Sequence, residues 1–403
     1  MTVTNFPNGI NTPFTITDIT AAEAAAGVTP TNYSYPAGDI RRYGAVDAAL
    51  VPGSLSYTAI AAAISSNAVV FIPSGTWVTD TSIELPTNVS LVGEGINQST
   101  IMWSFSAGLA GFDKGVVQTD AVALVFGIQI RELAISCNNV CDTALFIHGW
   151  QEQCGLWNVT LKESLSSPWI ISGGPVDNHA ATFQDVRVWS STSMVDTTIV
   201  PLIDIDDCRN CTFRRITASG IQSVASLMEY GLEVKAGAED NTFESIHVEF
   251  CDVGILNQGD GNTFINVTSH HNATAGSGTT HFQDQSGEFA LLNLYTYDNA
   301  GSTFTTHINH PRGSIATSAH DRTSFWLMGN NGTGYNISSS HLILREDSSG
   351  VDVLRQSDAS LGFYNATPVV QPTAVADATD AATAISQLNL LLARVRTLGL
   401  IAT

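Results

Sequence analysis

The chain is predicted to be all-β and folded as a right-handed parallel β-helix, because a short apolar pattern recurs along it at a nearly constant period. The pattern is Φ-x-x-Φ-x-Φ, where Φ is an apolar residue, and it returns every 21 to 30 residues. A period of this length is typical of solenoids, whereas a four-stranded propeller blade needs about 40 to 45 residues. The copies begin at Ile130, Leu156, Phe183, Phe213, Phe243, Phe264 and Leu291.

Each coil of the solenoid is predicted to carry two or three short strands, because a second β-rich run precedes most copies of the pattern. The apolar residues alternate with period two and lack the i, i+3, i+4 spacing of a helix. Gly and Asn between the runs, as in Gly259-Asp260-Gly261-Asn262, provide the left-handed backbone that the corners of a coil require. The second runs are residues 144–147, 169–171, 202–205, 232–234, 255–257 and 281–283.

Composition excludes two classes of partner. The chain holds 16 Lys and Arg against 37 Asp and Glu, for a formal net charge of −21. Phosphate binding needs clustered cations, so we expect no nucleic-acid partner. No run of about 18 or more apolar residues is present, and the amino terminus lacks the basic and apolar regions of an export signal. We therefore expect neither membrane insertion nor export by such a signal.

The six cysteines are expected to be buried free thiols. Cys154 and Cys211 occupy the same position of the repeat two coils apart. Coils stack at about 4.8 Å, so these Cα atoms lie about 10 Å apart, which is beyond disulfide reach. For Cys208-x-x-Cys211 a zinc or redox site is the alternative, and for Cys137 and Cys141 a local disulfide. The sixth is Cys251.

The segment before the repeats has a different pattern. It holds Tyr43-Gly44-Ala45, an amphipathic stretch at residues 56–67, and Pro73-Ser74-Gly75-Thr76 followed by Leu91-Val92-Gly93-Glu94-Gly95. This order resembles the entry of pectate-lyase-like β-helix proteins found in phage tailspikes and secreted polysaccharide-active enzymes. The resemblance implies that Tyr-Gly-Ala and a helix at residues 57–64 cap the solenoid, whose open end exposes a strand edge. The acidic Asp-Asp-Thr that often precedes this helix is replaced here by Pro52-Gly53-Ser54-Leu55-Ser56.

The carboxyl end is predicted to form a small β-rich domain followed by a helix. Residues 341–347 and 351–357 have the pattern of a hairpin. In the helix, Ala381, Ile385, Leu388, Leu392 and Val395 follow heptad spacing. A seam this short does not hold a lone helix in water, so we expect a homotrimer around it. The alternative is that the tail packs on its own β-helix.

The tail also resembles the ends of phage structural and tail-fibre proteins, in which a Gly-Phe-Tyr and Pro-rich element precedes a terminal helix. The residues that carry this resemblance are Gly362-Phe363-Tyr364, Pro368-Val369-Val370-Gln371-Pro372 and Leu398-Gly399-Leu400-Ile401. The domains expected are a docking segment at 1–36, the capped β-helix at 37–312, the β-rich domain at 313–376 and the oligomerisation helix at 377–403.

Two positions of each copy point outward by alternation and should form columns along one face of the solenoid. The first column follows the last Φ, and the second precedes it. Toward the fifth to seventh copies the columns gather titratable and aromatic side chains, with Asp252 and His271 close by. The first column is Ser136, Lys162, Trp189, Ser219, Glu249, His270 and Tyr297, and the second is Ala134, Thr160, Arg187, Thr217, His247, Thr268 and Tyr295.

These columns are the candidate functional site. Sugar cleavage needs two carboxylates, for which Glu249 and Asp252 are candidates, or a base beside charge stabilisation. His270 or His247 is the candidate base, with Arg187 or Tyr297 to stabilise charge. The ordinary alternative is a decorated, solvated sheet. The candidate glycan-binding residues are Arg187, Trp189, His247, Tyr295 and Tyr297.

No phosphate loop or dinucleotide fingerprint is present, so we expect no cofactor. The acidic pairs Asp206-Asp207 and Glu239-Asp240, with Asp260, raise calcium binding as an alternative to turn formation, and we expect no metal.

The function expected is that of a homotrimeric phage tailspike or tail fibre on the virion exterior, which binds host surface polysaccharide for adsorption. Its other partners would be phage tail or capsid proteins. A polysaccharide depolymerase of the same fold, hydrolase or lyase, is one alternative. A capsid or tail decoration protein without a ligand is the other.

Overall fold

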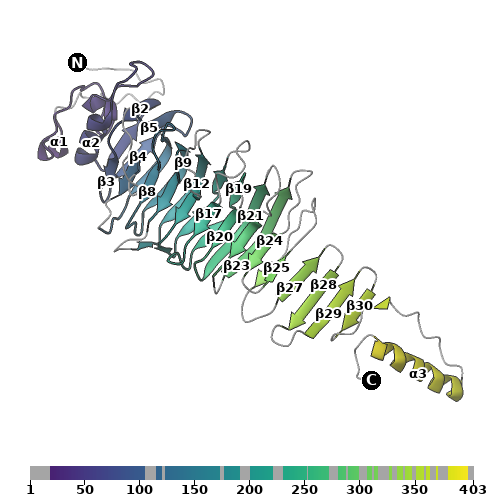
Figure 1. Ribbon diagram of the computed structural model, residues 1–403. Coiled ribbons are helices and arrows are strands. Elements are labelled where there is room, and N and C mark those ends of the chain that lie inside the picture. The colour runs from purple at the N-terminus through teal and green to yellow at the C-terminus, as the bar shows by residue number, and fades with distance from the viewer. Residues whose placement is uncertain are drawn as a thin grey trace, which may run out of the picture.

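Two long sheets of parallel strands form the walls of a solenoid in the computed structural model (Figure 1). The predicted parallel β-helix is therefore confirmed. The structure describes residues 19–104, 115–119, 123–172, 177–190, 200–220, 230–251, 253–271, 280–286, 289–298, 306–310, 313–315, 326–328, 334–338, 341–346, 351–357, 360–363, 369–370 and 380–397.

The long sheet holds the apolar pattern of every coil. Its neighbouring strands pair in parallel, except that the last, β26, is antiparallel to β23. Its strands are β1 (Val69–Ile72), β2 (Gly75–Thr79), β4 (Ser90–Gly93), β5 (Ser99–Trp103), β7 (Gln129–Ser136), β9 (Gly155–Ser164), β12 (Thr182–Ser190), β15 (Thr212–Arg214), β16 (Thr217–Ser219), β18 (Thr242–Glu244), β19 (His247–Glu249), β21 (Asn262–His271), β23 (Phe289–Asp298) and β26 (Trp326–Met328).

The second sheet holds the β-rich runs that precede the pattern. It too ends on an antiparallel strand, β25 against β24. Its strands are β3 (Ile83–Leu85), β6 (Val117–Thr119), β8 (Leu145–Ile147), β10 (Trp169–Ile171), β13 (Ile203–Ile205), β17 (Tyr230–Val234), β20 (Val253–Asn257), β22 (Thr280–Asp284), β24 (Thr306–His310) and β25 (Gly313–Ile315). A two-stranded sheet, β11 (Asn178–His179) and β14 (Cys208–Arg209), lies at one corner.

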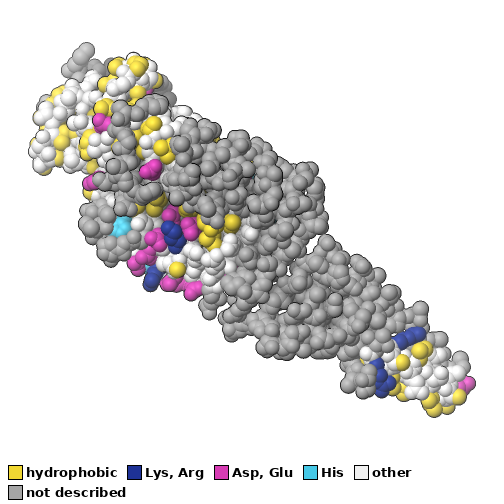
Figure 2. Space-filling model, viewed as in Figure 1, with side chains coloured by type: hydrophobic (Ala, Val, Ile, Leu, Met, Phe, Trp, Pro, Cys, Tyr) yellow, Lys and Arg dark blue, Asp and Glu magenta, His cyan; other side chains and the backbone are white. Residues whose placement is uncertain are grey.

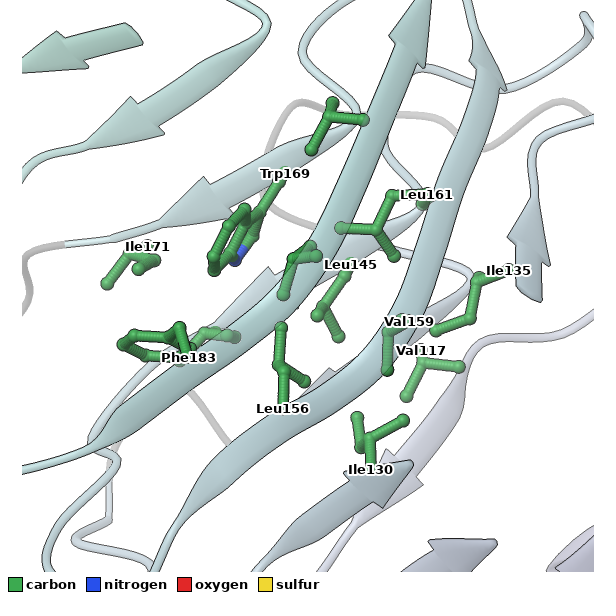
Figure 3. Packing of buried hydrophobic residues seen from close by; sticks show 14 of the residues in the cluster. Val117, Ile130, Ile135, Leu145, Leu156, Val159, Leu161, Trp169, Ile171 and Phe183 are labelled. Carbon is green, nitrogen blue, oxygen red and sulfur yellow. The ribbon is translucent and has the colours of Figure 1, made fainter. Parts of the chain in front are cut away.

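Between the sheets, corresponding residues of successive coils stack directly on one another. Phe183, Phe213, Phe243 and Phe264 are in register and fully buried or nearly so. Their ring centroids are 4.7, 4.6 and 4.6 Å apart with nearly parallel planes. This spacing is the separation of neighbouring strands, so each ring packs face to face with the next. Figure 3 shows Leu156 and Phe183 on neighbouring strands at the start of this stack. The Trp169 ring of the second sheet contacts Phe183 there.

A left-handed backbone residue explains the two-residue gap in Φ-x-x-Φ-x-Φ. The third position of the pattern has positive φ in six successive coils. This conformation turns the chain, so that positions one and four both point inward although they are three residues apart. The residues are Glu132, Asn158, Asp185, Arg215, Ser245 and Asn266, with φ between 51° and 58°. None of them is Gly, and each residue in this conformation costs about 1–2 kcal/mol.

A buried amide ladder forms the corner that leads into the later coils. The side-chain oxygen of Asn241 accepts the backbone N–H of Cys211 at 2.9 Å, and that of Asn262 accepts the N–H of Asn241 at 3.0 Å. The amide nitrogen of Asn241 donates to the Cys208 carbonyl at 2.9 Å. These hydrogen bonds satisfy backbone N–H and C=O groups at the corner. A buried backbone group without a partner there would be energetically costly.

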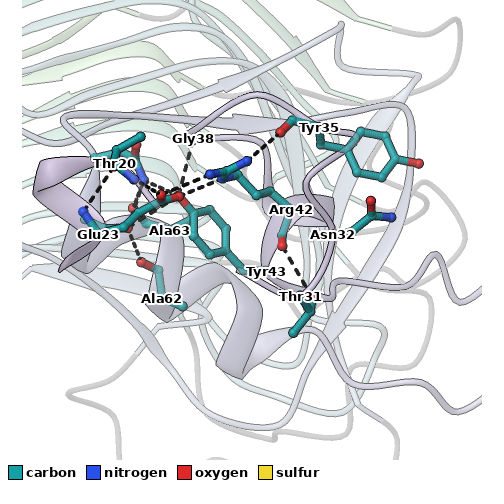
Figure 4. Close-up of polar contacts among 12 residues, drawn as sticks. Thr20, Glu23, Thr31, Asn32, Tyr35, Gly38, Arg42, Tyr43, Ala62 and Ala63 are labelled. Atoms are coloured by element: carbon teal, nitrogen blue, oxygen red, sulfur yellow. Dashed lines mark hydrogen bonds and ion pairs between the residues drawn. The ribbon is translucent and has the colours of Figure 1, made fainter. Parts of the chain in front are cut away.

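The N-terminal cap is fastened by a buried ion pair. It consists of α1 (Ala21–Ala25), the 3₁₀ helix η1 (Ile40–Tyr43) and α2 (Tyr57–Ser66). Glu23 and Arg42 are fully buried and join at 2.7 and 3.0 Å, and the Tyr43 hydroxyl donates to Glu23 at 2.8 Å (Figure 4). Gly44 ends η1 with φ of 94°. The predicted cap helix is confirmed, and residues 20–43 are part of the same cap.

The C-terminal region contains a separate five-stranded antiparallel sheet and a helix (Figure 1). The predicted hairpin is confirmed as the pair β28–β29. Helix α3 (Ala381–Thr397) begins where Asp380 accepts the Thr383 N–H at 2.7 Å. The strands are β27 (Gly334–Ser338), β28 (His341–Glu346), β29 (Val351–Ser357), β30 (Ser360–Phe363) and β31 (Val369–Val370).

Replacing a ring in the middle of the stack should destabilise the whole solenoid. Phe243→Ala removes a fully buried ring with partners on both sides, and we expect a loss of about 3–5 kcal/mol in the free energy of unfolding. Chemical denaturation followed by circular dichroism measures it. Thr263→Ala, at a partly exposed position of β21, is the matched control. Equal denaturation midpoints for the two variants would contradict the stacking account.

The cap should weaken in acid. The Arg42 guanidinium, with further hydrogen bonds from Thr20 and Tyr43, lowers the pKa of Glu23 from 4.5 to about 2. A depressed carboxyl pKa stabilises the fold above the unfolded pKa, and this contribution, about 3 kcal/mol, is lost as pH falls from 4.5 toward 2. Thermal melts should show Glu23→Gln below wild type at pH 7, with the gap narrowing at acid pH. The exposed Glu84→Gln should match wild type; a Glu23→Gln melt equal to wild type at pH 7 would refute the account.

Candidate functional site

The strand register of the long sheet contains both outward columns that were predicted from the repeat. Lys162, Trp189, Ser219, Glu249 and His270 face one another on successive strands. The second column runs parallel to it, through Thr160, Arg187, Thr217, His247 and Thr268. The columns therefore place side chains from coils far apart in the sequence along one line of the surface.

Among the column residues of the first two copies, Lys162 alone is accessible, at 29% exposed. Ser136, Ala134 and Thr160 point outward by register but are at most 5% exposed. Ser136 donates a hydrogen bond to Glu163. From Arg187 onward, the described column residues are partly or fully exposed. This accessible line, from Arg187 and Trp189 to Thr268 and His270, is called the outward face below.

Strand β12 contributes an aromatic ring and a cation to the outward face. Trp189 is 48% exposed, and Arg187, two residues earlier, is exposed on the same side of the strand. Val188 between them is fully buried, as the alternation of a strand requires. An indole ring held on a rigid strand presents a large flat apolar surface to solvent, and such a surface suits stacking.

Strands β19 and β21 contribute a carboxylate between two imidazoles. The Glu249 carboxylate lies 3.4 Å from His247 Nε2 and 3.7 Å from His270 Nδ1. Glu249 and His270 are 25% and 22% exposed, so the cluster is half-buried yet open to solvent. The ring of Phe250 lies 5.7 Å from that of His270 and borders it. A carboxylate beside imidazoles can hold or move a proton, and it can accept hydrogen bonds from hydroxyls.

Two of the residues predicted for the site are placed only in part, and a third is not described. Asp252 lies outside the described residues, so its relation to Glu249 stays a prediction. The backbones of Tyr295 and Tyr297 are in register with Thr268 and His270 on β23, while their side chains lie outside the described part. The structure brings together Glu249, His247 and His270, with Arg187 and Trp189 two coils away.

A ladder of paired charges borders the outward face, and sequence reasoning missed it. The Arg215 guanidinium donates two hydrogen bonds, of 2.6 and 2.7 Å, to the Asp185 carboxylate of the preceding coil. This interaction lowers the pKa of Asp185. Arg214 pairs with Glu244 at 3.1 Å. The signal was present, because opposite charges recur one period apart in the sequence. Exposed pairs of this kind contribute little stability, typically below about 1 kcal/mol.

Metal binding finds no support in the part of the chain that is described. No cluster of three or more His, Cys, Asp or Glu with metal-site geometry occurs among those residues.

All six cysteines are free and buried, as predicted, and burial raises the pKa of Cys137 and Cys208. At the acidic corner, burial and the nearby Asp177 raise the pKa of Asp207 to about 6. Figure 2 shows that acidic and basic side chains intermingle on the solenoid.

The described helices include none that is long and apolar enough to cross a membrane.

The fold and the repeat have a match among known families. The family model described as rhamnogalacturonase A/epimerase, pectate lyase-like, matches residues 56–301. The chain belongs to this family. The match starts at the cap helix and covers the outward face, so the pectate-lyase-like scaffold carries the whole candidate site. Comparison with curated protein sequences found no match.

Solved structures of similar fold come from diverse sources. ORF18 of Geobacillus virus E2 aligns with a TM-score of 0.41 at 11% identity, over 83% of this chain and 71% of that one. PfbA, a surface adhesin of Streptococcus pneumoniae, aligns with 0.49 at 12% identity, over 70% and 85%. An iota-carrageenase complexed to iota-carrageenan fragments aligns with 0.47 at 13%, over 72% and 64%. At these identities the likeness concerns the fold alone.

Proposed function

We propose that this protein binds a glycan along the outward face and acts as a homotrimeric tailspike or tail fibre on the exterior of a phage particle. The observation that carries the binding proposal is the in-register line of exposed side chains on the long sheet, with Trp189 as its largest apolar surface. The partner is a polysaccharide of the host cell surface, bound for adsorption.

The geometry of the solenoid fits a polymer better than a small molecule. The outward face is open and has a repeat of about 4.8 Å per coil. A chain of sugars laid along the axis meets a new pair of side chains at every coil. Aromatic, imidazole, hydroxyl and guanidinium groups along this line offer stacking and hydrogen bonds to successive hydroxyl-rich units.

The virion assignment rests on the two ends of the chain. The cap and the tail carry sequence elements that resemble phage proteins, and α3 presents unpartnered apolar side chains. Ile385 and Leu388 are 64% and 55% exposed, and Figure 2 shows apolar side chains on the surface of this helix. Leu392 and Val395, part-exposed, continue the seam. Three such seams packed together would shield it, and the cap end would face other phage tail or capsid proteins.

A second candidate function is cleavage of the bound polysaccharide. It is favoured by the Glu249 carboxylate held between His247 and His270. Glu249 would serve as general acid or base, His270 as its proton partner, and Asp252 as the second carboxylate. A depolymerase would use the same face as a binder, so the two functions differ only in whether product forms.

Binding and cleavage separate in one experiment. Purified protein is titrated with host envelope polysaccharide, and reducing ends and unsaturated uronates are followed. We expect binding, and Trp189→Ala should weaken it at least about tenfold, because a central aromatic anchor is lost. Phe126→Ala removes an exposed ring outside the columns and should change nothing. Product that disappears in Glu249→Gln would establish the depolymerase; absence of binding to any host glycan would leave a decoration protein.

Assembly is tested separately. Light scattering should give a mass about three times 42.7 kDa for the full chain. Leu388→Asp places a charge in the seam and should yield a monomer that keeps the β-sheet signal in circular dichroism and loses helical signal, because a lone helix of this length is marginal in water. Ser386→Asp, exposed on the same helix, is the control that should remain trimeric. A monomeric wild type would contradict the trimer.

A further inference from the structure

The corner that carries β11 and β14 stacks two acidic side chains on one another. In this two-stranded sheet Asn178 pairs with Cys208, so Asp177 and Asp207, the residues directly before each strand, occupy matching positions of adjacent coils. Neighbouring parallel strands are about 4.8 Å apart. The two carboxyl groups lie within hydrogen-bonding reach of each other. Two ionised carboxylates cannot make that hydrogen bond, because neither has a donor.

Asp207 is also enclosed by the coil that follows it. A Cβ placed on Gly237 would lie 2.7 Å from the Asp206 carbonyl oxygen and 3.5 Å from the Asp207 carboxyl carbon, so the backbone of that coil packs against the acid. The Oδ1 atom of Asp207 is buried and accepts no hydrogen bond from the described residues. Ionisation of Asp207 therefore places charge where solvation is poor.

The cation that faces the pair is shared with a third acid. Arg209 on β14 lies 3.8 Å from the Asp177 carboxylate and 3.5 Å from that of Glu239 in the following coil. Asp206, next to Asp207 in the chain, adds a further negative charge. One exposed guanidinium among four acids does not neutralise two stacked carboxylates.

Two other basic side chains near this corner have partners of their own. Lys235 of the following coil lies 2.8 Å from Asp204. His179, in register with Arg209 on β11, lies 3.7 Å from Glu152. Neither ion pair supplies charge to the stacked aspartates.

A single proton resolves this arrangement, because a protonated carboxyl can donate a hydrogen bond to an ionised one. Burial of Asp207 and the charge of Asp177 beside it raise the pKa of Asp207 to about 6. The pair therefore keeps its proton in mild acid and releases it to solvent near neutral pH.

We propose that Asp177 and Asp207 share one proton and form a pH-sensitive latch, which joins the corners of two adjacent coils in mild acid and loosens at neutral pH. Once the proton has left, the two carboxylates repel each other across the contact between the coils. The inference goes beyond the proposed function and does not rest on it, because this corner belongs to a different sheet from the outward face.

The direction of the effect follows from linkage between protonation and folding. The pKa of Asp207 is higher in the folded chain than its ordinary value of 3.8. The contribution of the pair to stability is therefore fully present below pH 3.8 and is lost as the pH rises through about 6. Glu23 in the cap acts in the opposite direction and at lower pH, since its pKa is about 2. Melts above about pH 5 separate the two effects.

Thermal melts of the full chain at about pH 5 and about pH 7.5 test the latch. Asp207→Asn replaces the proton-bearing carboxyl with an amide that can donate to Asp177 at either pH. We expect this variant to match wild type at the lower pH and to melt about 2 °C or more above it at the higher pH. Asp177→Asn removes the other half of the pair and should give a gain of the same sign.

Asp185→Asn is the matched control, because Arg215 keeps this carboxylate ionised and lowers its pKa. The melting temperature of this variant relative to wild type should not change between the two pH values. Amide hydrogen exchange followed by mass spectrometry then locates the effect. After correction for intrinsic rates, wild-type peptides that contain residues 203–210 should lose protection about threefold or more at the higher pH, and those of Asp207→Asn should not.

A constant difference between the melting temperatures of wild type and Asp207→Asn at the two pH values would overturn the latch. Exchange at residues 203–210 that is independent of pH, or that changes equally in both proteins, would overturn it too. Should Asp207→Asn not fold, Asp177→Asn and the exchange of wild type decide the same question. The glycan-binding proposal stands in each case, because it depends on the outward face.

Discussion

Parallel, in-register pairing of successive coils is the constraint on which the rest of this molecule depends. It places each residue directly against its counterpart one period away, so every position of the coil becomes a column. Inward columns must be chemically alike, as the stack from Phe183 to Phe264 shows. Outward columns are free to vary, so a binding surface can form on them. The same constraint leaves open strand edges at both ends, which explains the buried Glu23–Arg42 cap and the antiparallel strands β25 and β26.

Two kinds of device keep the coils in register. Left-handed residues at one position of each coil set where the chain turns, and buried amides such as Asn241 bind the corners together. Charged pairs such as Asp185–Arg215 also join adjacent coils on the outer surface, but each contributes little to the free energy of unfolding. Since all of these connect adjacent coils, a change in one coil is felt first by its two neighbours, as expected of a solenoid.

Much of this was predictable from the sequence because the apolar pattern repeats. The period gave the solenoid, and alignment of the copies gave both outward columns, the separation of Cys154 from Cys211 and the neighbours of Glu249. The conformation at Glu132, Arg215 and Ser245 was not predictable, because these residue types rarely adopt positive φ and are held there by the surrounding coils. The burial of Ser136 and Thr160 could not be predicted either. The alternation of a strand shows to which side of the sheet a side chain points, but not whether another part of the chain covers it.

The central claim is that the outward face of the long sheet is where a glycan lies. A crystal structure of the full chain with an oligosaccharide, cut from whichever polysaccharide binds most tightly, tests it directly. We predict a sugar chain that runs along the solenoid axis, with one ring over Trp189 and further contacts toward His247 and Glu249. A sugar chain bound on the second sheet, or one that leaves the columns empty, would contradict it.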